Sequence, residues 1–201
     1  YGIASGMSYL HSHDVILTNL NPSSIYLDDF LFPKITKLEN FMKMSTRIID
    51  EYGDYYNSED EYYSPERMKF NIYSSAGDVY SFAMVIYQLI ANEKPFSNIV
   101  THELYDIVVK QKIRPELKQT IPKCYRTLIE RCWSDDPKDR PTFNEIVLHL
   151  KTCNDFITDK VNKEEFQNYM KYVEEATDID SSSNNKLLQV QDFIQTQNQT
   201  F

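Results

Sequence analysis

Apolar residues at the start of the chain recur every three or four positions, as Ile3, Met7 and Leu10 do. This spacing places them on one face of an amphipathic helix over the first dozen residues, which residues 11–13 would end. The first residue is Tyr rather than Met, and residues 1–4 already have the pattern of a helix interior. We therefore expect the printed sequence to begin partway through a domain.

Two short runs of β-prone residues follow, at positions 24–27 and 31–35, on either side of the turn-forming pair Asp28-Asp29. This arrangement predicts a small β-hairpin. Pro33 lies in the second run and lacks the backbone N–H that an inner strand needs, so that arm can only be an edge strand.

Residues 79–90 are apolar on nearly every face of a helix. A helix with this pattern belongs at the centre of a domain, because each of its sides needs a partner. Ser74 or Ser75 can cap its start, where the acidic side chain of Asp78 lies near the positive end of the helix dipole. Pro95 follows its expected end.

Four further helices are expected from periodicity and end signals. The best of these signals is a capping box, in which Thr142 and Glu145 can satisfy each other's backbone N–H groups. The helices are expected over residues 102–110, which has the weakest pattern, 122–133, 142–151 and 163–175.

Other stretches lack any period. Residues 45–64 mix acidic residues with five tyrosines and predict a long, mobile, acidic loop. Its acidic surroundings favour tyrosines that are exposed or packing aromatics over phosphorylation sites, because a phosphate would be repelled. Residues 181–185 are expected to form a polar linker, and the Gln-rich end is expected to be disordered.

Composition narrows the possible partners and compartment. The formal net charge is −9, which disfavours binding to nucleic acid or anionic membranes, since both need basic surface. No apolar run approaches the length of a membrane span. The three cysteines, Cys124, Cys132 and Cys153, are an odd number without metal-ligand spacing. They indicate reduced thiols in a cytoplasmic protein.

Five short motifs occur in an order that resembles the C-terminal lobe of a protein kinase, closest in character to the tyrosine-kinase-like members. The resemblance covers residues 1–151. The motifs are L-T-N-L-N-P-S-S at 17–24 in place of H-R-D-L-x-x-x-N, K-L-E at 37–39 in place of D-F-G, S-P-E at 64–66 in place of A-P-E, D-V-Y-S-F at 78–82, and C-W-S at 132–134 followed by Pro137, Arg140 and Pro141.

The resemblance implies a mainly α fold, a protein-kinase-like C-terminal lobe with a small β-hairpin; the complete domain would be two-lobed α+β. We expect this lobe to span residues 1–153, a helical extension residues 154–180, and a polar tail residues 181–201. The printed sequence contains no Gly-rich loop, strand Lys or helix Glu of an N-terminal lobe, and has only 4 glycines. We therefore expect the N-terminal lobe, and with it most of an ATP site, to be absent from this chain.

Positions that hold such a lobe together carry the family's residue types. Glu66 and Arg140 resemble an ion pair that ties the end of the activation segment to the lobe. Asp78 resembles the residue that anchors the backbone of the catalytic loop, and Trp133 is expected to fill the lower core.

Positions that carry chemistry in the family are all changed. Asn19 stands in place of the catalytic base, Asn21 in place of the Lys that steadies the transferred phosphate, and Ser24 in place of an Asn metal ligand. Lys37 replaces the metal-binding Asp and offers Mg²⁺ a positive charge instead of an oxygen. Thr18 replaces an Arg that pairs with activation-loop phosphate.

These changes predict a pseudokinase that binds protein partners, with no cofactor. The alternative is an active or weakly active Ser/Thr protein kinase that uses Mg-ATP, with Glu39 as its substitute metal ligand. Lys37 also leaves open nucleotide binding without metal, because its ammonium can neutralise phosphates. A third reading is an incomplete product that does not fold alone, with the face of the missing lobe exposed as an apolar patch.

Overall fold

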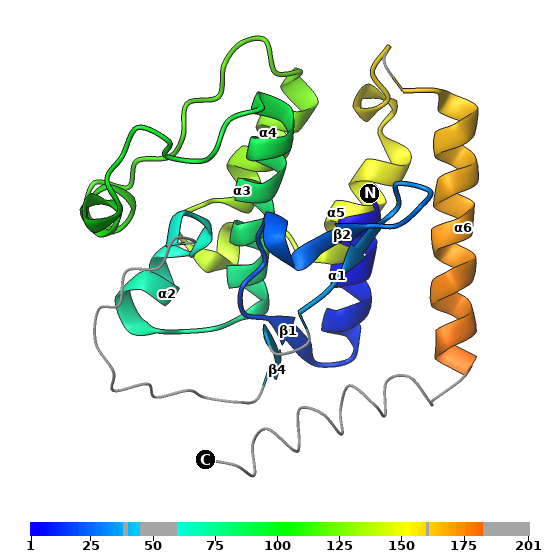
Figure 1. The fold of residues 1–201 in the computed structure, drawn as a ribbon, viewed down its shortest axis with the longest axis horizontal. Helices are drawn as coiled ribbons and strands as arrows, with labels where there is room; N and C mark the ends of the chain where they lie inside the picture. The colour runs from blue at the N-terminus through cyan, green and yellow to red at the C-terminus, as the bar shows by residue number, and fades with distance from the viewer. Residues whose placement is uncertain (38–39, 45–59, 160, 183–201) are drawn as a thin grey trace.

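The computed structural model describes residues 1–37, 40–44, 60–159 and 161–182, and the account below concerns these residues. Helices dominate the described chain (Figure 1). The helices are α1 (Gly2–Ser12), α2 (Pro65–Phe70), α3 (Ser75–Ala91), α4 (Lys123–Cys132), α5 (Phe143–Thr152) and α6 (Lys163–Ser182). The strands are β1 (Val15–Leu17), β2 (Ile25–Leu27), β3 (Pro33–Ile35) and β4 (Phe41–Lys43). The expected mainly α fold with a small hairpin is confirmed.

Helix α3 passes through the core, as its pattern predicts. It begins at Ser74, whose hydroxyl accepts a hydrogen bond from the backbone N–H of Gly77 at 3.0 Å. It ends at Asn92, which takes the left-handed backbone conformation that closes many helices. Tyr80, Ala83 and Met84 are fully buried, and α4 packs along the helix. The central placement follows because nearly every face of α3 is apolar.

Two short antiparallel strand pairs lie beside α1. The predicted hairpin forms between β2 and β3, with Ile25 opposite Ile35. A second pair joins β1 to β4, with Ile16 opposite Met42. This second pair was not predicted, because β1 is only three residues long and its partner lies more than twenty positions away. Together the pairs hold the segment between β1 and β2 in place.

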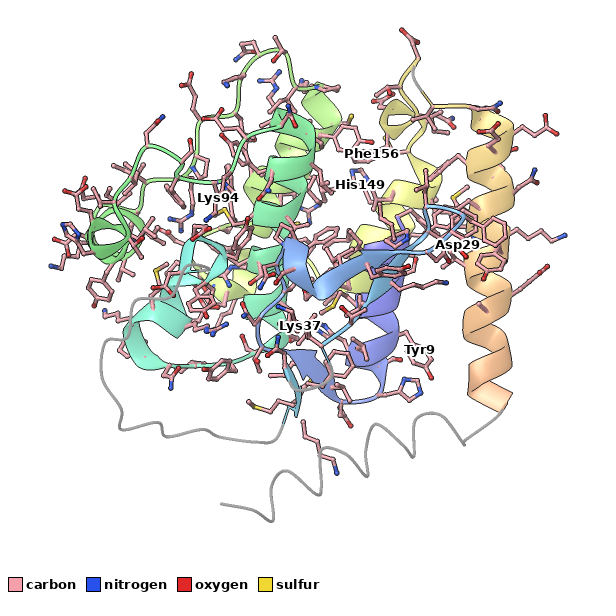
Figure 2. All side chains as sticks on the ribbon, in the orientation of Figure 1. Tyr9, Asp29, Lys37, Lys94, His149 and Phe156 are labelled. Carbon is pink, nitrogen blue, oxygen red and sulfur yellow. The ribbon has the colours of Figure 1, made fainter. Side chains whose placement is uncertain are left out.

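Helix α6 folds back along α1 and the hairpin (Figure 1). The ring of Tyr169 lies 4.5 Å from that of Phe32 and 6.4 Å from that of Tyr1, measured between centroids. Before α6, a 3-10 turn at Asn154–Phe156 places Phe156 against His149 of α5, with ring centroids 5.1 Å apart (Figure 2). The turn at Asn154–Phe156 and helix α6 therefore pack on the preceding part of the described chain.

Most predicted helices are confirmed, with differences at three places. The weak helix over residues 102–110 is a 3-10 turn at Thr101–Glu103 followed by a π-helical turn at Asp106–Lys110. Helix α6 runs to Ser182, so the start of the predicted linker is wrong. Helix α2 was not predicted, because six residues with no buried side chain give no readable period.

Two predicted segments lie wholly or partly outside the described residues. The predicted acidic loop lies outside the described residues up to position 59, as does the tail from 183. All three cysteines are free, and burial raises the pKa of Cys132 to about 12. In the part of the chain described here, no helix is long and apolar enough to span a bilayer.

Candidate functional site

The segment between β1 and β2, residues 17–24, is held closed by its own polar groups; we call it the 17–24 loop. The side-chain oxygen of Asn21 accepts hydrogen bonds from the backbone N–H of Ser23 at 2.7 Å and from its hydroxyl at 2.6 Å. The hydroxyl of Ser24 donates to the carbonyl of Asn21 at 2.8 Å and accepts from its N–H at 3.1 Å. Asn21 and Ser24 are buried, so these groups are committed to the loop itself.

Lys37 reaches this loop from the segment after β3 (Figure 2). Its ammonium donates a hydrogen bond to the Ser23 hydroxyl at 2.6 Å. The preceding residue, Thr36, donates from its N–H to the carbonyl of Ser24 at 2.8 Å, which fixes the position of the Lys37 backbone relative to the loop. Lys37 has a φ of 62°, an uncommon backbone conformation for a side chain of this size. The positive charge is therefore held against the loop at the place where the hairpin returns.

Asn19 lies at the turn of the 17–24 loop. Its backbone carbonyl accepts a hydrogen bond from the side-chain amide of Asn21 at 3.2 Å. An amide side chain in this place can orient a hydroxyl group, but it cannot take up a proton at neutral pH.

Asp78 of α3 anchors the start of the loop. Its carboxylate accepts a hydrogen bond from the backbone N–H of Leu17 at 2.9 Å and contacts Nε2 of His11 at 2.8 Å. Burial raises the pKa of Asp78, and the contacts with His11 and Leu17 oppose that shift. The His11 contact was not predicted: His11 was expected only to end α1, and no local pattern pairs it with a residue 67 positions later.

Arg67 of α2 also contacts the 17–24 loop. Its guanidinium lies 3.2 Å from the ring centroid of Tyr63 and 4.9 Å from that of Tyr73, and it donates a hydrogen bond to the carbonyl of Thr18. The side chain therefore joins α2 to the 17–24 loop. This contact was not predicted: the sequence shows only that Arg67 follows the S-P-E motif, which does not indicate its partner.

Glu66 and Arg140 form a two-pronged ion pair, with N–O distances of 2.6 and 2.9 Å. The Arg140 side chain is fully buried, and it also donates to the carbonyls of Ala76 at 2.9 Å and Ser134 at 2.8 Å. These extra bonds matter, because a buried guanidinium is tolerated only when its donors are satisfied. Trp133 is 6% exposed and packs beside Tyr87 in the core.

The chemistry of the loop does not fit a divalent cation with bound triphosphate. Mg²⁺ prefers carboxylate, phosphate and water oxygens. The 17–24 loop supplies amides and hydroxyls that bond to one another, and Lys37 adds a cation among them. Glu39 lies outside the described residues. Within the described ranges, no three His, Cys, Asp or Glu side chains gather in a group that could hold a metal.

The order of these elements and the two-pronged pair between Glu66 and Arg140 agree with the comparison by sequence. Residues 1–150 match the family described as protein tyrosine and serine/threonine kinase. The chain belongs to this family. The match covers α1 to α4 and most of α5, and with them the 17–24 loop, Lys37, Asp78 and the Glu66–Arg140 pair.

Three relatives from Dictyostelium discoideum illustrate the match. A dual specificity protein kinase is 35% identical over 147 residues, which is 72% of this chain and 10% of the relative. A probable LIM domain-containing serine/threonine-protein kinase is 33% identical over 163 residues, 80% of this chain and 24% of the relative. A probable serine/threonine-protein kinase is 31% identical over 151 residues, 75% of this chain and 11% of the relative. The chain thus spans between a tenth and a quarter of the length of these relatives.

Proposed function

We propose that this chain is the C-terminal lobe of a pseudokinase, a kinase-family protein that binds protein partners and does not transfer phosphate. The observation that carries the proposal is the closed set of bonds joining Lys37, Ser23 and Asn21. In the family, the positions of Lys37 and Asn21 are aligned with a metal ion and with the transferred phosphate, and Ser23 here bridges the two.

Electrostatics support the loss of metal binding. Two unit charges about 4 Å apart interact by about 4 kcal/mol at an effective dielectric constant near 20, and a divalent ion experiences about twice that. Replacing an attractive carboxylate by the ammonium of Lys37 reverses the sign of this interaction. The loss of the base at Asn19 adds to it, because an amide cannot accept the proton of the attacking hydroxyl.

The retained scaffold supports a binding role. The buried pair of Glu66 and Arg140 and the anchor at Asp78 preserve the shape of the lobe around an altered loop. A chain that needs neither metal nor base still needs this shape if other proteins recognise its surface. The net charge of −9 also supports protein partners over nucleic acid or anionic membranes, which need basic surface.

The deciding experiment is a phosphotransfer assay on the full-length protein with Mg-ATP, beside an Asn19→Ala variant. We expect both proteins to give background levels of transfer. Robust transfer by the native protein that disappears in the variant would overturn the proposal, because Asn19 would then carry a catalytic role.

The second candidate is a working Ser/Thr protein kinase that uses unusual groups with Mg-ATP. The printed names of the relatives, which are serine/threonine and dual specificity protein kinases, favour it. This candidate needs a metal ligand other than Ser24 and Lys37, and Glu39 is the nearest acid in sequence. A Glu39→Gln change that abolishes phosphotransfer would support it, whereas background transfer by both native and variant proteins would remove it.

A further inference from the structure

A wide hollow of the described chain lies away from the 17–24 loop. It is a groove of about 710 Å³ between the C-terminal end of α3, the helical turns at 101–110 and the segment that leads to α4; we call it the 93–118 groove. These segments are the green part of the ribbon on the left of Figure 1. The volume falls in the range of protein pockets that bury most of a drug-sized ligand.

The floor of the groove is apolar. It is lined by Tyr87, Phe96, Ile99, Ile107, Ile113 and Pro115. Ile113 is 47% exposed there, so apolar surface faces solvent that a ligand would cover. Phe96 lines the groove with a φ of 54°, a conformation that is rare for a bulky residue and requires support from its surroundings.

The rim is acidic once its ion pairs are considered. Glu93 is held by Lys118 at 2.8 Å. The donors of Arg114 are turned to Asp135 and to backbone carbonyls, among them that of Trp133 at 3.1 Å. The cations of the groove are thus already engaged.

Two carboxylates on the rim remain. Glu103 and Glu116 are exposed, line the groove, and form no salt bridge with any residue that the structure describes. The charge of Glu116 acts on Lys118 and helps to raise its pKa, but Lys118 is hydrogen-bonded to Glu93. Exposed acids alone would be unremarkable on a chain of net charge −9, but here they border an apolar floor. A ligand that fits must cover the floor and offer positive charge to the rim.

We propose that the 93–118 groove binds a peptide segment in which Lys or Arg lies beside a large apolar residue. The apolar side chain covers Ile113 and Phe96, and the cation lies between Glu103 and Glu116. This inference names the partner chemistry for the binding role proposed above. It does not depend on the loss of catalysis, because an active kinase can also use such a groove.

The test is selection from random twelve-residue peptides displayed on phage, with the 201-residue chain immobilised at low salt. We expect the selected peptides to carry Lys or Arg next to a large apolar residue. The double variant Glu103→Gln/Glu116→Gln is expected to bind them at least tenfold more weakly, and added salt should weaken native binding. A matched control, Glu130→Gln/Glu164→Gln, removes two exposed acids outside the groove and should bind as the native chain does.

A second variant separates the floor from the rim. Ile113→Ser should weaken binding severalfold without altering the salt dependence, and thermal melting checks that each variant folds. The proposal is overturned by failure to enrich any peptide, by selected peptides without a cation, or by equal affinity of the double variant. It is also overturned if the chain self-associates through the groove, seen as sedimentation of a dimer that the double variant lacks.

Phosphotransfer by the same variants separates this inference from the proposed function. The groove variants should match the native chain in that assay, whatever its level. Peptide binding together with robust phosphotransfer would retain the groove and reject the pseudokinase. Background phosphotransfer without peptide binding would reject the groove as a peptide site and retain the pseudokinase.

Discussion

The ammonium of Lys37 and the hydroxyl of Ser23 lie 2.6 Å apart, and this bond ties the segment after β3 to the 17–24 loop. Ser23 in turn donates to the side-chain oxygen of Asn21 at 2.6 Å. A cation supplied by the chain therefore contacts the hydroxyl of the 17–24 loop that is bonded to Asn21. Removing the charge of Lys37 should therefore first affect the conformation of the 17–24 loop.

Restoring the two missing carboxylates should not restore activity. In the double variant Asn19→Asp/Lys37→Asp, Asn21 and Ser24 still bond to each other and still lack the groups that hold phosphate and a second metal. We expect phosphotransfer from radiolabelled ATP to a general protein substrate to stay at background. The single variants are the controls, and transfer well above background in the double variant alone would favour a kinase that lost only two groups.

Nucleotide binding gives a separate test of Lys37. If its ammonium neutralised phosphates in place of Mg²⁺, ATP would raise the melting temperature of the full-length protein equally with and without EDTA, because binding to the folded state alone stabilises it. We expect no shift in either condition. An equal shift in both, lost in Lys37→Ala, would instead establish metal-independent binding.

The pair between Glu66 and Arg140 should behave as a buried ion pair. Glu66→Gln leaves the fully buried guanidinium of Arg140 without its counter-charge, and breaking such pairs typically costs about 3–5 kcal/mol. Urea unfolding should show a loss in that range, somewhat reduced because Arg140 still donates to the carbonyls of Ala76 and Ser134.

Comparison with a double variant tests the coupling of this pair. In Glu66→Gln/Arg140→Met neither side chain of the pair carries a charge, so the loss in unfolding free energy should be smaller than the sum of the two single losses. Strict additivity would mean that the two residues stabilise the chain independently, against the geometry of two bonds at 2.6 and 2.9 Å.

Asp78 makes a specific contribution to the pH dependence of stability. Burial raises its pKa in the folded chain above 3.8, the ordinary value of an aspartate, so between these two values the folded state holds a proton that the unfolded state has released. Stability from this group therefore falls as pH rises from about 4 through the folded-state pKa. Asp78→Asn removes that contribution.

The measurement is urea unfolding of the native chain and Asp78→Asn at a series of pH values. The variant should be less stable where the charge-assisted bonds to Leu17 and His11 are lost, but its deficit should shrink as pH rises through this range. A deficit that grows with pH would show that His11 and Leu17 outweigh burial and hold the folded-state pKa low.

The sequence predicted what local patterns encode. The capping box of Thr142 and Glu145 forms as expected, with the Glu145 N–H donating to the Thr142 hydroxyl at 3.2 Å, and α3 is central because its pattern leaves no polar face. The β1–β4 pair and the contact of His11 with Asp78 were missed, since both join residues far apart along the chain. Their roles depend on tertiary placement, which no periodicity reports.

For the candidate site too, the residue types could be predicted from the sequence and the contacts between them could not. The residue types at Asn19, Asn21, Ser24 and Lys37 were readable one by one against a resemblance to kinases. Their bonds to one another were not, because the same residues in an open loop would have the same sequence. The contact of Arg67 with the Thr18 carbonyl was likewise invisible, although it joins α2 to that loop.

The attachment of α6 depends on the absence of a side chain at Gly2. A methyl group built there would lie 1.9 Å from the hydroxyl oxygen of Tyr169 and 2.9 Å from Cγ of Pro33, closer than atoms can approach. Gly2→Ala should therefore displace Tyr169 and loosen α6, even though Ala favours the helical backbone of α1. Hydrogen exchange over residues 163–176 should become severalfold faster. Gly77→Ala is the matched control, since its methyl group would meet only ordinary contacts at 3.4 Å or more. Unchanged exchange in Gly2→Ala would mean that the Lys151–Glu174 ion pair, and not the contact with Tyr169, holds α6 in place.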